Sequence, residues 1–410
     1  MLKLTRVAVP AMLLVCNNVW AQSSVVLYGV IDAGFTYLTN AQTGKAASGA
    51  LSGSHQFAFT DGATRGIGGS RWGLKGSEDL GGGLSAVFTM ESGFMINNGT
   101  LGQGGAAFGR QIFVGFDSPW GIVTAGRQYD TEADFVSAYT PYMIVGLTGA
   151  LPGDIDGDAH TRRVNNSIKY KTPLFHGFQA GAMYSLGGQA GDYTHNQVLA
   201  LGVSYSLNAF SMGAGYYNSR NPNLATFGNN PNSGGPTVNN LGSSGTPTSP
   251  QSNPVYAGYA SAHSFEVYAA GLSYAFGPLT TAALFAHVAF ENLGDLHSGP
   301  NPLHYAGSAI FNNAELSLMY KISPVLLFGG AYTYTRNGGA NGRGGANYQQ
   351  GIVGVQYFLS KRTELYASAE YQVASGTDSL GQHAVANIAL LTPSSNTHQL
   401  AARVGLLHRF

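Results

Sequence analysis

The sequence predicts an all-β protein, a sixteen-stranded antiparallel β-barrel that crosses a membrane. Three observations lead to this prediction. Apolar and polar residues alternate one by one along many segments, tight turns alternate with long polar loops, and charged residues make up only 10% of the 410 residues. A typical soluble domain carries about 25% charged residues. The 44% hydrophobic residues and 58 glycines suit a sheet with one apolar face and many turns.

The first 21 residues predict a cleaved signal peptide. Lys3 and Arg6 precede an uncharged run at 7–16, and the small residue Ala21 marks the cleavage site. Residues 22–410 then form the mature barrel. A lipid anchor on Cys16 is the alternative, although bulky Val15 precedes that cysteine where a small residue is preferred. Because Cys16 is the only cysteine, no internal disulfide can form.

The strands follow from the period-two pattern. In 314–322 the residues at even positions are all apolar (Ala, Leu, Leu, Tyr, Ile), whereas Glu315, Ser317, Met319 and Lys321 fall on odd ones, as in a strand with one apolar face. The uncharged stretch 267–290 is broken by Gly277-Pro278, so it reads as two strands rather than a membrane-spanning helix. The sixteen predicted strands are 25–37, 69–77, 84–94, 108–117, 121–128, 163–172, 177–186, 196–207, 210–218, 263–276, 279–291, 310–322, 325–336, 348–359, 363–375 and 397–410.

The connections point to an outer-membrane barrel. Tight turns such as 78–83, 117–120 and 277–278 alternate with long polar loops, of which the longest is about 218–262. Sixteen strands are wide enough to leave an aqueous channel. Tyrosine and phenylalanine gather near strand ends, where aromatic girdles belong, at Tyr37, Phe113, Phe116, Tyr205, Tyr274, Phe276, Tyr332, Tyr334, Tyr371 and Phe410. Phe410 ends the last strand and reads as an outer-membrane assembly signal or as a girdle residue.

Several stretches from the first strand to the last residue resemble the general trimeric porins of Gram-negative bacteria, in the branch typical of β-proteobacteria. They are 24–34 (SVVLYGVIDAG), 70–84 (SRWGLKGSEDLGGGL), 126–128 (GRQ), 165–170 (NNSIKY), 358–363 (FLSKRT) and 404–410 (VGLLHRF). The resemblance implies a homotrimer of outer-membrane barrels, with the third long loop folded into each lumen as a constriction loop. It also implies partners of three kinds: membrane lipids, the assembly machinery through the C-terminal strand, and small hydrophilic solutes and ions.

Strand parity predicts which charged side chains face the lumen. A charge on the lipid face costs roughly 2–4 kcal/mol at the bilayer midplane, so charges belong on the inward parity. The inward set is Asp32, Arg71, Lys75, Glu91, Arg110, Arg163 and Arg403. By resemblance, Arg71, Arg110 and Arg163 match the family's row of arginines at the pore constriction. Arg162 would replace Arg163 if the strand register slips by one residue.

The loop between Tyr129 and Thr161 is the predicted constriction loop. It could set its carboxylates against the arginine wall as a transverse field, through Asp130, Glu132, Asp134, Asp154, Asp156 and Asp158. The loop lacks the Pro-Glu-Phe-Gly signature of enterobacterial porins, so no single acid can be assigned from the resemblance. The pattern Asp154-x-Asp156-x-Asp158 also resembles the start of a calcium loop, but the later glycine and glutamate are missing. A hydrated acidic turn is the simpler interpretation.

The remaining chemistries find no support. The chain has no zinc spacing among its histidines, no Gly-x-Ser-x-Gly elbow and no phosphate loop, so we expect no cofactor, no metal and no catalysis. The formal net charge is zero and no basic run occurs, which disfavours nucleic acid as a partner.

The sequence therefore predicts a general-diffusion porin of the outer membrane, which passes small hydrophilic solutes passively. The five inward cations favour anions, while the six loop acids could cancel or reverse that preference. Alternatives are a substrate-specific sugar or phosphate channel, a barrel enzyme acting on lipids, and an adhesin anchored by its barrel.

Overall fold

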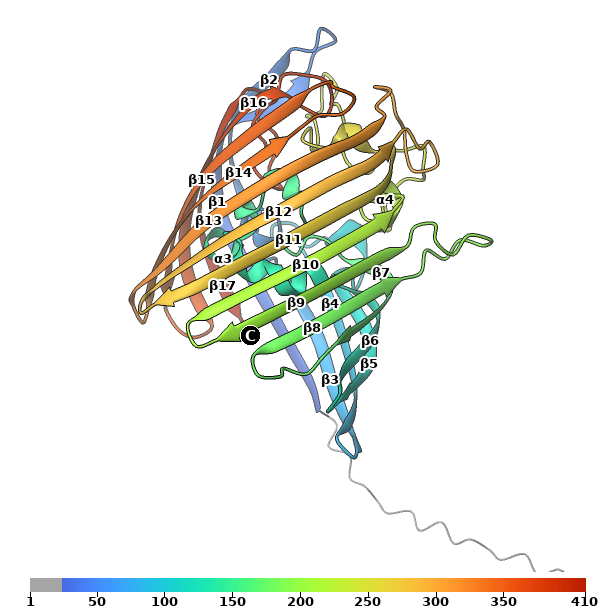
Figure 1. The fold of residues 1–410 in the computed structure, drawn as a ribbon. Coiled ribbons are helices and arrows are strands. Elements are labelled where there is room, and N and C mark those ends of the chain that lie inside the picture. Colours follow the sequence, from blue (N-terminus) through green and yellow to red (C-terminus); the bar gives the residue numbers. More distant parts are fainter. Residues whose placement is uncertain (1–23) are drawn as a thin grey trace, which may run out of the picture.

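A single closed antiparallel sheet forms the wall of the molecule (Figure 1). The computed structural model describes residues 24–410. Within them the strands are β1 (Ser24–Lys45), β2 (Leu51–Asp61), β3 (Arg71–Gly81), β4 (Leu84–Gly93), β5 (Gln111–Ser118), β6 (Gly121–Gln128), β7 (Val164–Lys171), β8 (Phe178–Ser185), β9 (Val198–Leu207), β10 (Phe210–Arg220), β11 (Ala262–Phe276), β12 (Leu279–Leu293), β13 (Gly307–Ser323), β14 (Leu326–Asn337), β15 (Gly345–Phe358), β16 (Thr363–Thr377) and β17 (His398–Arg409). The helices are α1 (Gly62–Arg65), α2 (Thr131–Val136), α3 (Tyr142–Val145) and α4 (Pro222–Ala225), with 3-10 turns η1 (Gln103–Gly105), η2 (Ser137–Tyr139), η3 (Gly146–Gly149), η4 (Pro152–Asp154) and η5 (Ala257–Tyr259).

The sheet has sixteen wall positions. The lower half of β1 pairs with β3, from Ser24↔Ser77 to Val30↔Arg71, and its upper half pairs with β2, from Ala33↔Asp61 to Lys45↔Leu51. β2 and β3 are therefore two parts of one wall strand, interrupted by residues 62–70. The last strand, β17, returns to β1 and closes the barrel. The predicted sixteen-stranded antiparallel barrel is confirmed.

The first two strands are longer than the alternation predicts. The prediction that β1 ends at 37 and that the second strand begins at 69 was wrong, because β1 runs to Lys45 and β2 begins at Leu51. The missed segments carry Thr39, Gln42, Ser52 and Ser54, which read as a polar loop. Near the long-loop rim both faces of a strand can meet water, so a strand there need not alternate in polarity.

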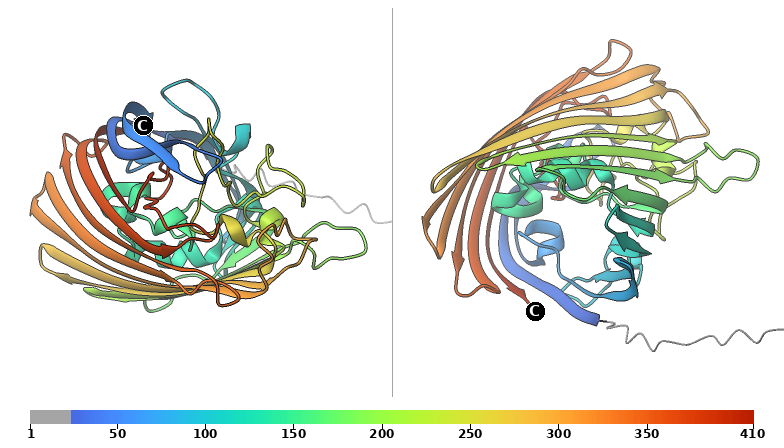
Figure 2. Two further views of the ribbon diagram at one scale, coloured as in Figure 1. Left: turned by 90° about the horizontal axis from the view of Figure 1, so that it is seen from above. Right: turned by 60° about the horizontal axis from the view of Figure 1, so that its bottom comes forward.

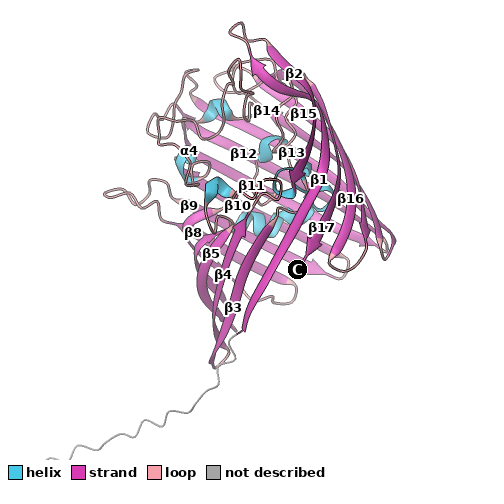
Figure 3. Cartoon of the chain, turned by 180° about the vertical axis from the view of Figure 1, so that it is seen from behind, coloured by secondary structure: helices cyan, strands magenta, loops and turns pink. Residues whose placement is uncertain are grey.

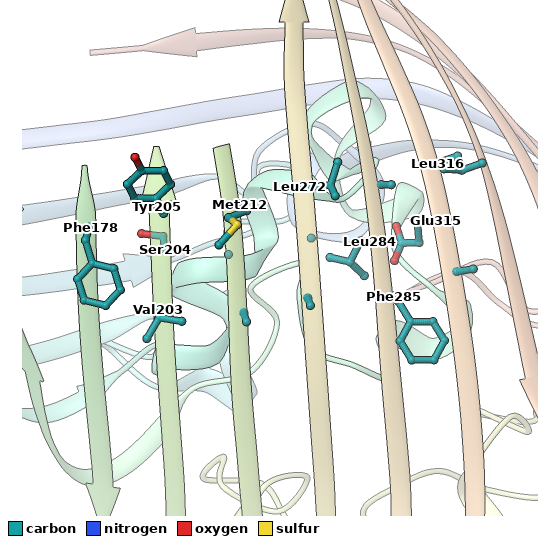
Figure 4. A pocket seen from close by; sticks show the side chains of 16 residues that line it. Phe178, Val203, Ser204, Tyr205, Met212, Leu272, Leu284, Phe285, Glu315 and Leu316 are labelled. Carbon is teal, nitrogen blue, oxygen red and sulfur yellow. The ribbon is translucent and has the colours of Figure 1, made fainter. Parts of the chain in front are cut away.

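The wall has an apolar outer face and a polar inner face. On β13, Leu316 is 63% exposed whereas Glu315 beside it is 2% exposed. Figure 4 shows the wall made by β8–β13, where apolar side chains line an outer groove of about 850 Å³: Phe178, Val203, Met212, Leu272, Phe285 and Leu316. Among the helices of residues 24–410, none is both long and apolar enough to cross a bilayer.

A buried charge network fastens the seam where β17 meets β1. Arg403 Nη2 lies 3.2 Å from Asp32 Oδ1, and the Tyr366 hydroxyl on β16 donates to the same oxygen at 2.6 Å. Arg403 also donates to Thr60 Oγ1 on β2 at 2.6 Å. Asp32 and Arg403 are 0% and 3% exposed. The network thus ties four strand segments together at the point of closure.

Arg403→Met is expected to destabilise the barrel by about 3–5 kcal/mol, because it leaves Asp32 buried without its cation. Urea unfolding in detergent micelles measures the loss. The double variant Arg403→Met/Asp32→Asn should recover part of it, since neither charge then remains. Arg362→Gln, at an exposed turn position, is the control and should change the free energy of unfolding little. Equal losses in Arg403→Met and Arg362→Gln would contradict the role of the network.

Candidate pore constriction

Residues 129–163 fold into the barrel rather than over it (Figures 2 and 3). The segment follows β6 directly, and Asp130 caps α2 by accepting the Ala133 N–H at 2.9 Å. The chain then passes through η2, α3, η3 and η4 before it enters β7. We call residues 129–163 the constriction loop.

Glycines on the inner wall allow the constriction loop to pack closely against the strands. A Cβ on Gly213 would lie 2.2 Å from the Phe135 carbonyl oxygen, and one on Gly271 would lie 2.7 Å from the Tyr139 ring. Gly213 and Gly271 are cross-strand partners. We call the whole set the glycine track: Gly181, Gly202, Gly213, Gly215, Gly271, Gly329 and Gly354. The loop therefore packs against bare backbone, which brings it closer to the wall than any side chain would permit.

The far end of the constriction loop is held by polar side chains on the opposite wall. Thr148 donates to Glu370 Oε1 on β16 at 2.9 Å and its carbonyl accepts from Gln350 on β15 at 3.0 Å. Gln356, also on β15, donates to the Ile144 carbonyl at 3.0 Å. Since the loop starts at β6 and touches β8–β11 before it reaches β14–β16, it spans the lumen.

Three arginines gather where the wall meets this loop, Arg71 and Arg110 from the wall and Arg163 from the end of the loop. Arg110 Nε lies 2.7 Å from Glu91 Oε1, and Arg71 Nε lies 3.6 Å from Glu91 Oε2. Arg110 and Arg163 both donate to the Tyr129 hydroxyl, at 2.7 and 2.9 Å. Glu91 and Tyr129 therefore link the three predicted constriction arginines into one chain of contacts.

A fourth arginine, Arg127, joins them, and the sequence interpretation missed its place in the lumen. Its guanidinium donates to neutral acceptors only, the carbonyls of Gly109 and Asn229 and the side chains of Asn165 and Asn230. The signal was present in the Gly126-Arg127-Gln128 motif. Among residues 24–410, neither Arg127 nor Arg163 forms an ion pair with a carboxylate. Of these four guanidinium groups, those of Arg71 and Arg110 share Glu91, and the other two have no carboxylate partner within that range.

The four arginines line three neighbouring cavities that share lining residues. A cavity of about 190 Å³ is lined by Arg127 and Arg163, and the next, of about 230 Å³, by Arg163 and Arg110. Tyr142 of the constriction loop lines this second cavity and also a third, of about 300 Å³, that Arg71 borders. We call this series, in the order 127, 163, 110 and 71, the arginine ladder.

Arg162 and Arg163 point to different surroundings. Arg162 bonds Asp130 at 3.2 Å and Glu132 at 2.9 Å, and its guanidinium lies 4.0 Å from the centroid of the Tyr217 ring. Arg163 instead stacks 4.8 Å from the Tyr129 ring, beside Arg110. Arg163, the residue first assigned by parity, is therefore the member of the ladder.

Within the described residues, none of the six acids of the constriction loop pairs with an arginine of the ladder, although Asp154 lines the first cavity beside Arg127 and Arg163. Asp130 and Glu132 pair with Arg162, and Asp134 pairs with Lys169 at 2.9 Å and with Lys171 at 3.8 Å. Asp154 accepts from the Thr161 hydroxyl, and Asp156 and Asp158 are each 1% exposed. No ion pair of the described residues joins any of the six to Arg71, Arg110 or Arg163. The arginines therefore face no matching row of paired carboxylates.

The other residues singled out by sequence lie at the periphery. Lys75 is exposed, with its Nζ 5.5 Å from the centroid of the Tyr28 ring, and Tyr28 donates to Glu91 on the inner face. Phe410 exchanges two backbone hydrogen bonds of 3.1 Å with Gly29. Within residues 24–410, no three His, Cys, Asp or Glu side chains are grouped so as to hold a metal ion.

The long loop 221–261, expected to be polar, brings aromatic side chains into the upper lumen. The rings of Phe227 and Tyr256 lie 5.3 Å apart between centroids and are tilted by 37°, and both stack on Phe290 of β12, at 6.4 and 6.0 Å. This packing fills the mouth over β11–β13. The open cavities therefore lie beside the arginine ladder.

Comparisons with known proteins agree with this architecture. A family model described as Gram-negative porin matches residues 8–377. An outer membrane porin protein of Bordetella pertussis is 30% identical over 400 residues, which cover 95% of each chain. Outer membrane porin protein 32 of Delftia acidovorans is 32% identical over 181 residues, which cover 43% of this chain and 47% of that one. The solved anion-selective porin from Comamonas acidovorans superposes with a TM-score of 0.67 at 20% identity, over 95% of this chain and 100% of that one, which speaks for the fold. The predicted family resemblance is confirmed: this chain belongs to the Gram-negative porins, the channel-forming β-barrels of the outer membrane.

Proposed function

We propose that the protein is a homotrimeric general-diffusion porin that prefers anions. The arginine ladder and the constriction loop form the narrowest part of its pore, with Arg71, Arg110 and Arg163 as the wall arginines. The observation that carries the anion preference is the imbalance of charge along the ladder, where, of the described residues, Glu91 is the one carboxylate paired with any of the four guanidinium groups and the loop acids form no ion pair with them. Fixed charge at the narrowest point of a pore raises the local concentration of the opposite ion.

The ends of the chain fit this proposal. Residues 1–21 act as the signal peptide, which lies outside the described residues. Phe410 and the alternating strand β17 serve as the signal for the assembly machinery, and the outward apolar face contacts the membrane lipids. The family and the fold are those of a channel rather than an enzyme.

Reconstitution in a planar bilayer under a salt gradient tests the proposal. We expect stepwise conductance in groups of three, one step for each barrel of a trimer, and a reversal potential whose sign corresponds to anion flow. The preference should weaken at high salt, because the Debye length falls from about 10 Å at 0.1 M to about 3 Å at 1 M. A cation-preferring potential would overturn the proposed selectivity. Folded protein without conductance would favour the enzyme or anchor alternatives.

A substrate-specific channel for small anions is the second candidate. The specific observation in its favour is that the passage beside the ladder is divided into cavities of about 190, 230 and 300 Å³. A specific channel saturates as its solute concentration rises, whereas general diffusion stays linear. Conductance measured against the concentration of phosphate and of chloride therefore separates the two candidates.

A further inference from the structure

One strand of the barrel wall is broken by a segment that turns into the lumen. Residues 62–70 lie between β2 and β3, and α1 begins this segment inside the barrel (Figure 2). Ser70 is 0% and Arg65 is 8% exposed, so the segment is enclosed and is not a surface loop. The predicted second strand begins at 69, and the sequence interpretation therefore gave residues 62–68 no role. We call residues 62–70 the wall insert.

Asp32 of β1 holds the wall insert in place. Its Oδ2 accepts the Gly68 N–H at 2.9 Å, and its backbone N–H donates to Ser70 Oγ at 3.1 Å. A Cβ on Gly66 would lie 2.5 Å from Asp32 Oδ2, and one on Gly62 would collide with the same carboxyl group. Two glycines therefore let the backbone of the insert wrap closely around this carboxylate. Because Asp32 belongs to the charge network at the seam, the insert is fixed where the barrel closes.

Two carbonyl groups of the wall insert reach the pore constriction. The Gly66 carbonyl accepts the Leu147 N–H of the constriction loop at 3.2 Å. The neighbouring Gly146 has a φ of 78°, and a Cβ there would collide with the same carbonyl oxygen. The Gly69 carbonyl accepts a hydrogen bond from Arg71 Nη1 at 3.0 Å. The insert thus contacts the constriction loop through one carbonyl and an arginine of the ladder through the other.

The hydrogen bond to the Gly69 carbonyl sets the direction of the Arg71 side chain. Among the described residues it is the one hydrogen bond that this side chain forms, whereas the Glu91 carboxylate lies 3.6 Å from Arg71 Nε. A backbone carbonyl cannot rotate away as a side chain can, so it is a fixed acceptor. Because the guanidinium is a rigid planar fork, an acceptor on one arm orients the whole group. A shift of the wall insert would therefore move the charge of Arg71.

The wall insert also lines the passage itself. Ala63 and Gly69 line the cavity of about 230 Å³ together with Arg110 of the ladder. Ile67 and Gly68 line the neighbouring cavity of about 300 Å³. Solutes that pass the arginine ladder therefore move along the insert, which fills a part of the lumen that an unbroken strand would leave open.

We propose that the wall insert is a second constriction element of the pore, in which the Gly69 carbonyl positions Arg71 and the Gly66 carbonyl positions the constriction loop. The proposal rests on the proposed function, in which the arginine ladder sets the anion preference at the narrowest part of the pore. The insert acts on selectivity through another residue, so Gly66, Gly69 and Ser70 are positioning residues. Its effect on the ion preference should therefore largely disappear once Arg71 is neutralised.

The reversal potential of Gly66→Ala in a planar bilayer under a salt gradient tests this proposal. The new methyl group displaces the insert from Asp32 and moves the Gly69 carbonyl with it, so Arg71 loses its fixed direction. We expect the permeability ratio of anions to cations to fall roughly threefold, because moving a unit charge from about 5 to about 8 Å away from passing ions changes their occupancy by roughly 1.7-fold, in opposite directions for anions and cations. Added to Arg71→Gln, the same change should lower the ratio much less.

Gly330→Ala on β14 is the matched control, because the nearest atom to its Cβ would lie at 3.6 Å. It should keep the wild-type ratio, and urea unfolding of each variant verifies that the barrel is intact. Should Gly66→Ala fail to fold, Ser70→Ala carries the test, since it removes the hydroxyl that bonds the backbone of Asp32 without adding an atom. Its control is Ser92→Ala, at a serine that is 1% exposed and whose hydroxyl has no hydrogen-bond partner among the described residues.

The outcomes separate the wall insert from the proposed function. A fall in the ratio that depends on Arg71 supports the insert as a positioning element, and a rise in the single-channel conductance of Gly66→Ala supports its contact with the constriction loop. An equal fall with and without Arg71 would overturn the role of the insert in favour of a general distortion of the barrel. An anion-preferring wild type whose ratio neither Gly66→Ala nor Ser70→Ala changes overturns the insert alone, whereas a cation-preferring wild type overturns the proposed function.

Discussion

Replacing Arg71 and Arg110 together with glutamine is expected to move the ion preference of the channel strongly towards cations. Both guanidinium groups border the cavities of the arginine ladder, and both contact Glu91. A unit charge about 5 Å from a passing ion is worth about 0.8 kcal/mol in water, so two charges change the occupancy of each ion roughly tenfold. Anions lose occupancy while cations gain it, and Glu91 remains without its two partners. The reversal potential under a salt gradient measures the change.

The matched control for this charge change is the double variant Lys361→Gln/Arg362→Gln. It also removes two positive charges, but at exposed positions in the turn between β15 and β16. It should leave the reversal potential close to that of the wild type, because distant exposed charges are screened by salt. If the two double variants shift the potential equally, total charge rather than the ladder sets the selectivity.

Gly213→Val is expected to widen the pore by forcing the constriction loop away from the wall. The first carbon of the new side chain would lie 2.2 Å from the Phe135 carbonyl oxygen, a contact that neither backbone can accommodate. Overpacking of this kind typically destabilises the folded state by about 1–3 kcal/mol, and here the constriction loop can relieve it by moving away from the wall. Single-channel conductance should rise and the anion preference should fall, since ions then pass farther from the arginines.

Gly351→Val on β15 provides the comparison, because a Cβ there meets no atom within 4 Å. It should keep the wild-type conductance. Should Gly213→Val fail to assemble, Gly271→Ala offers a milder test, since its Cβ would meet the Tyr139 ring at 2.7 Å. Wild-type conductance in a folded Gly213→Val barrel would show that the loop does not depend on the bare backbone.

The strands were predictable because the signals that define them are local. Side-chain alternation and turn residues such as Gly277-Pro278 act within a few positions, so they determined the strand number and most strand ends. The upper part of β1 was missed because polar residues occupy both of its faces. β2 was missed although Phe57 and Phe59 alternate with Gln56 and Thr60, because this alternation covers only a few residues. Arg71 and Arg110 could be assigned from parity and resemblance for the same local reason.

The remainder of the site depends on contacts between distant segments. Strand parity placed Arg163 in the lumen, but it could not tell that Arg162 meets Asp130 and that Arg163 meets Tyr129. The direction of the loop acids likewise depends on Arg162, Lys169 and Lys171, which belong to the end of the loop and to β7. Phe227 and Tyr256 stand among Asn, Pro and Ser residues, so their stacking on Phe290 was hidden by the composition of their loop.

The glycine track has a consequence for how such channels can diverge. The pore width depends on the constriction loop packing against glycines of the wall. The ion preference depends instead on the arginine side chains across the passage. A single codon change at Arg71 or Arg110 can therefore alter which solutes are favoured without resizing the opening. A change at Gly213 or Gly271 resizes the opening without touching the arginines. Charge preference can therefore change alone in this barrel, whereas a change of width also weakens the charge preference, because ions then pass farther from the arginines.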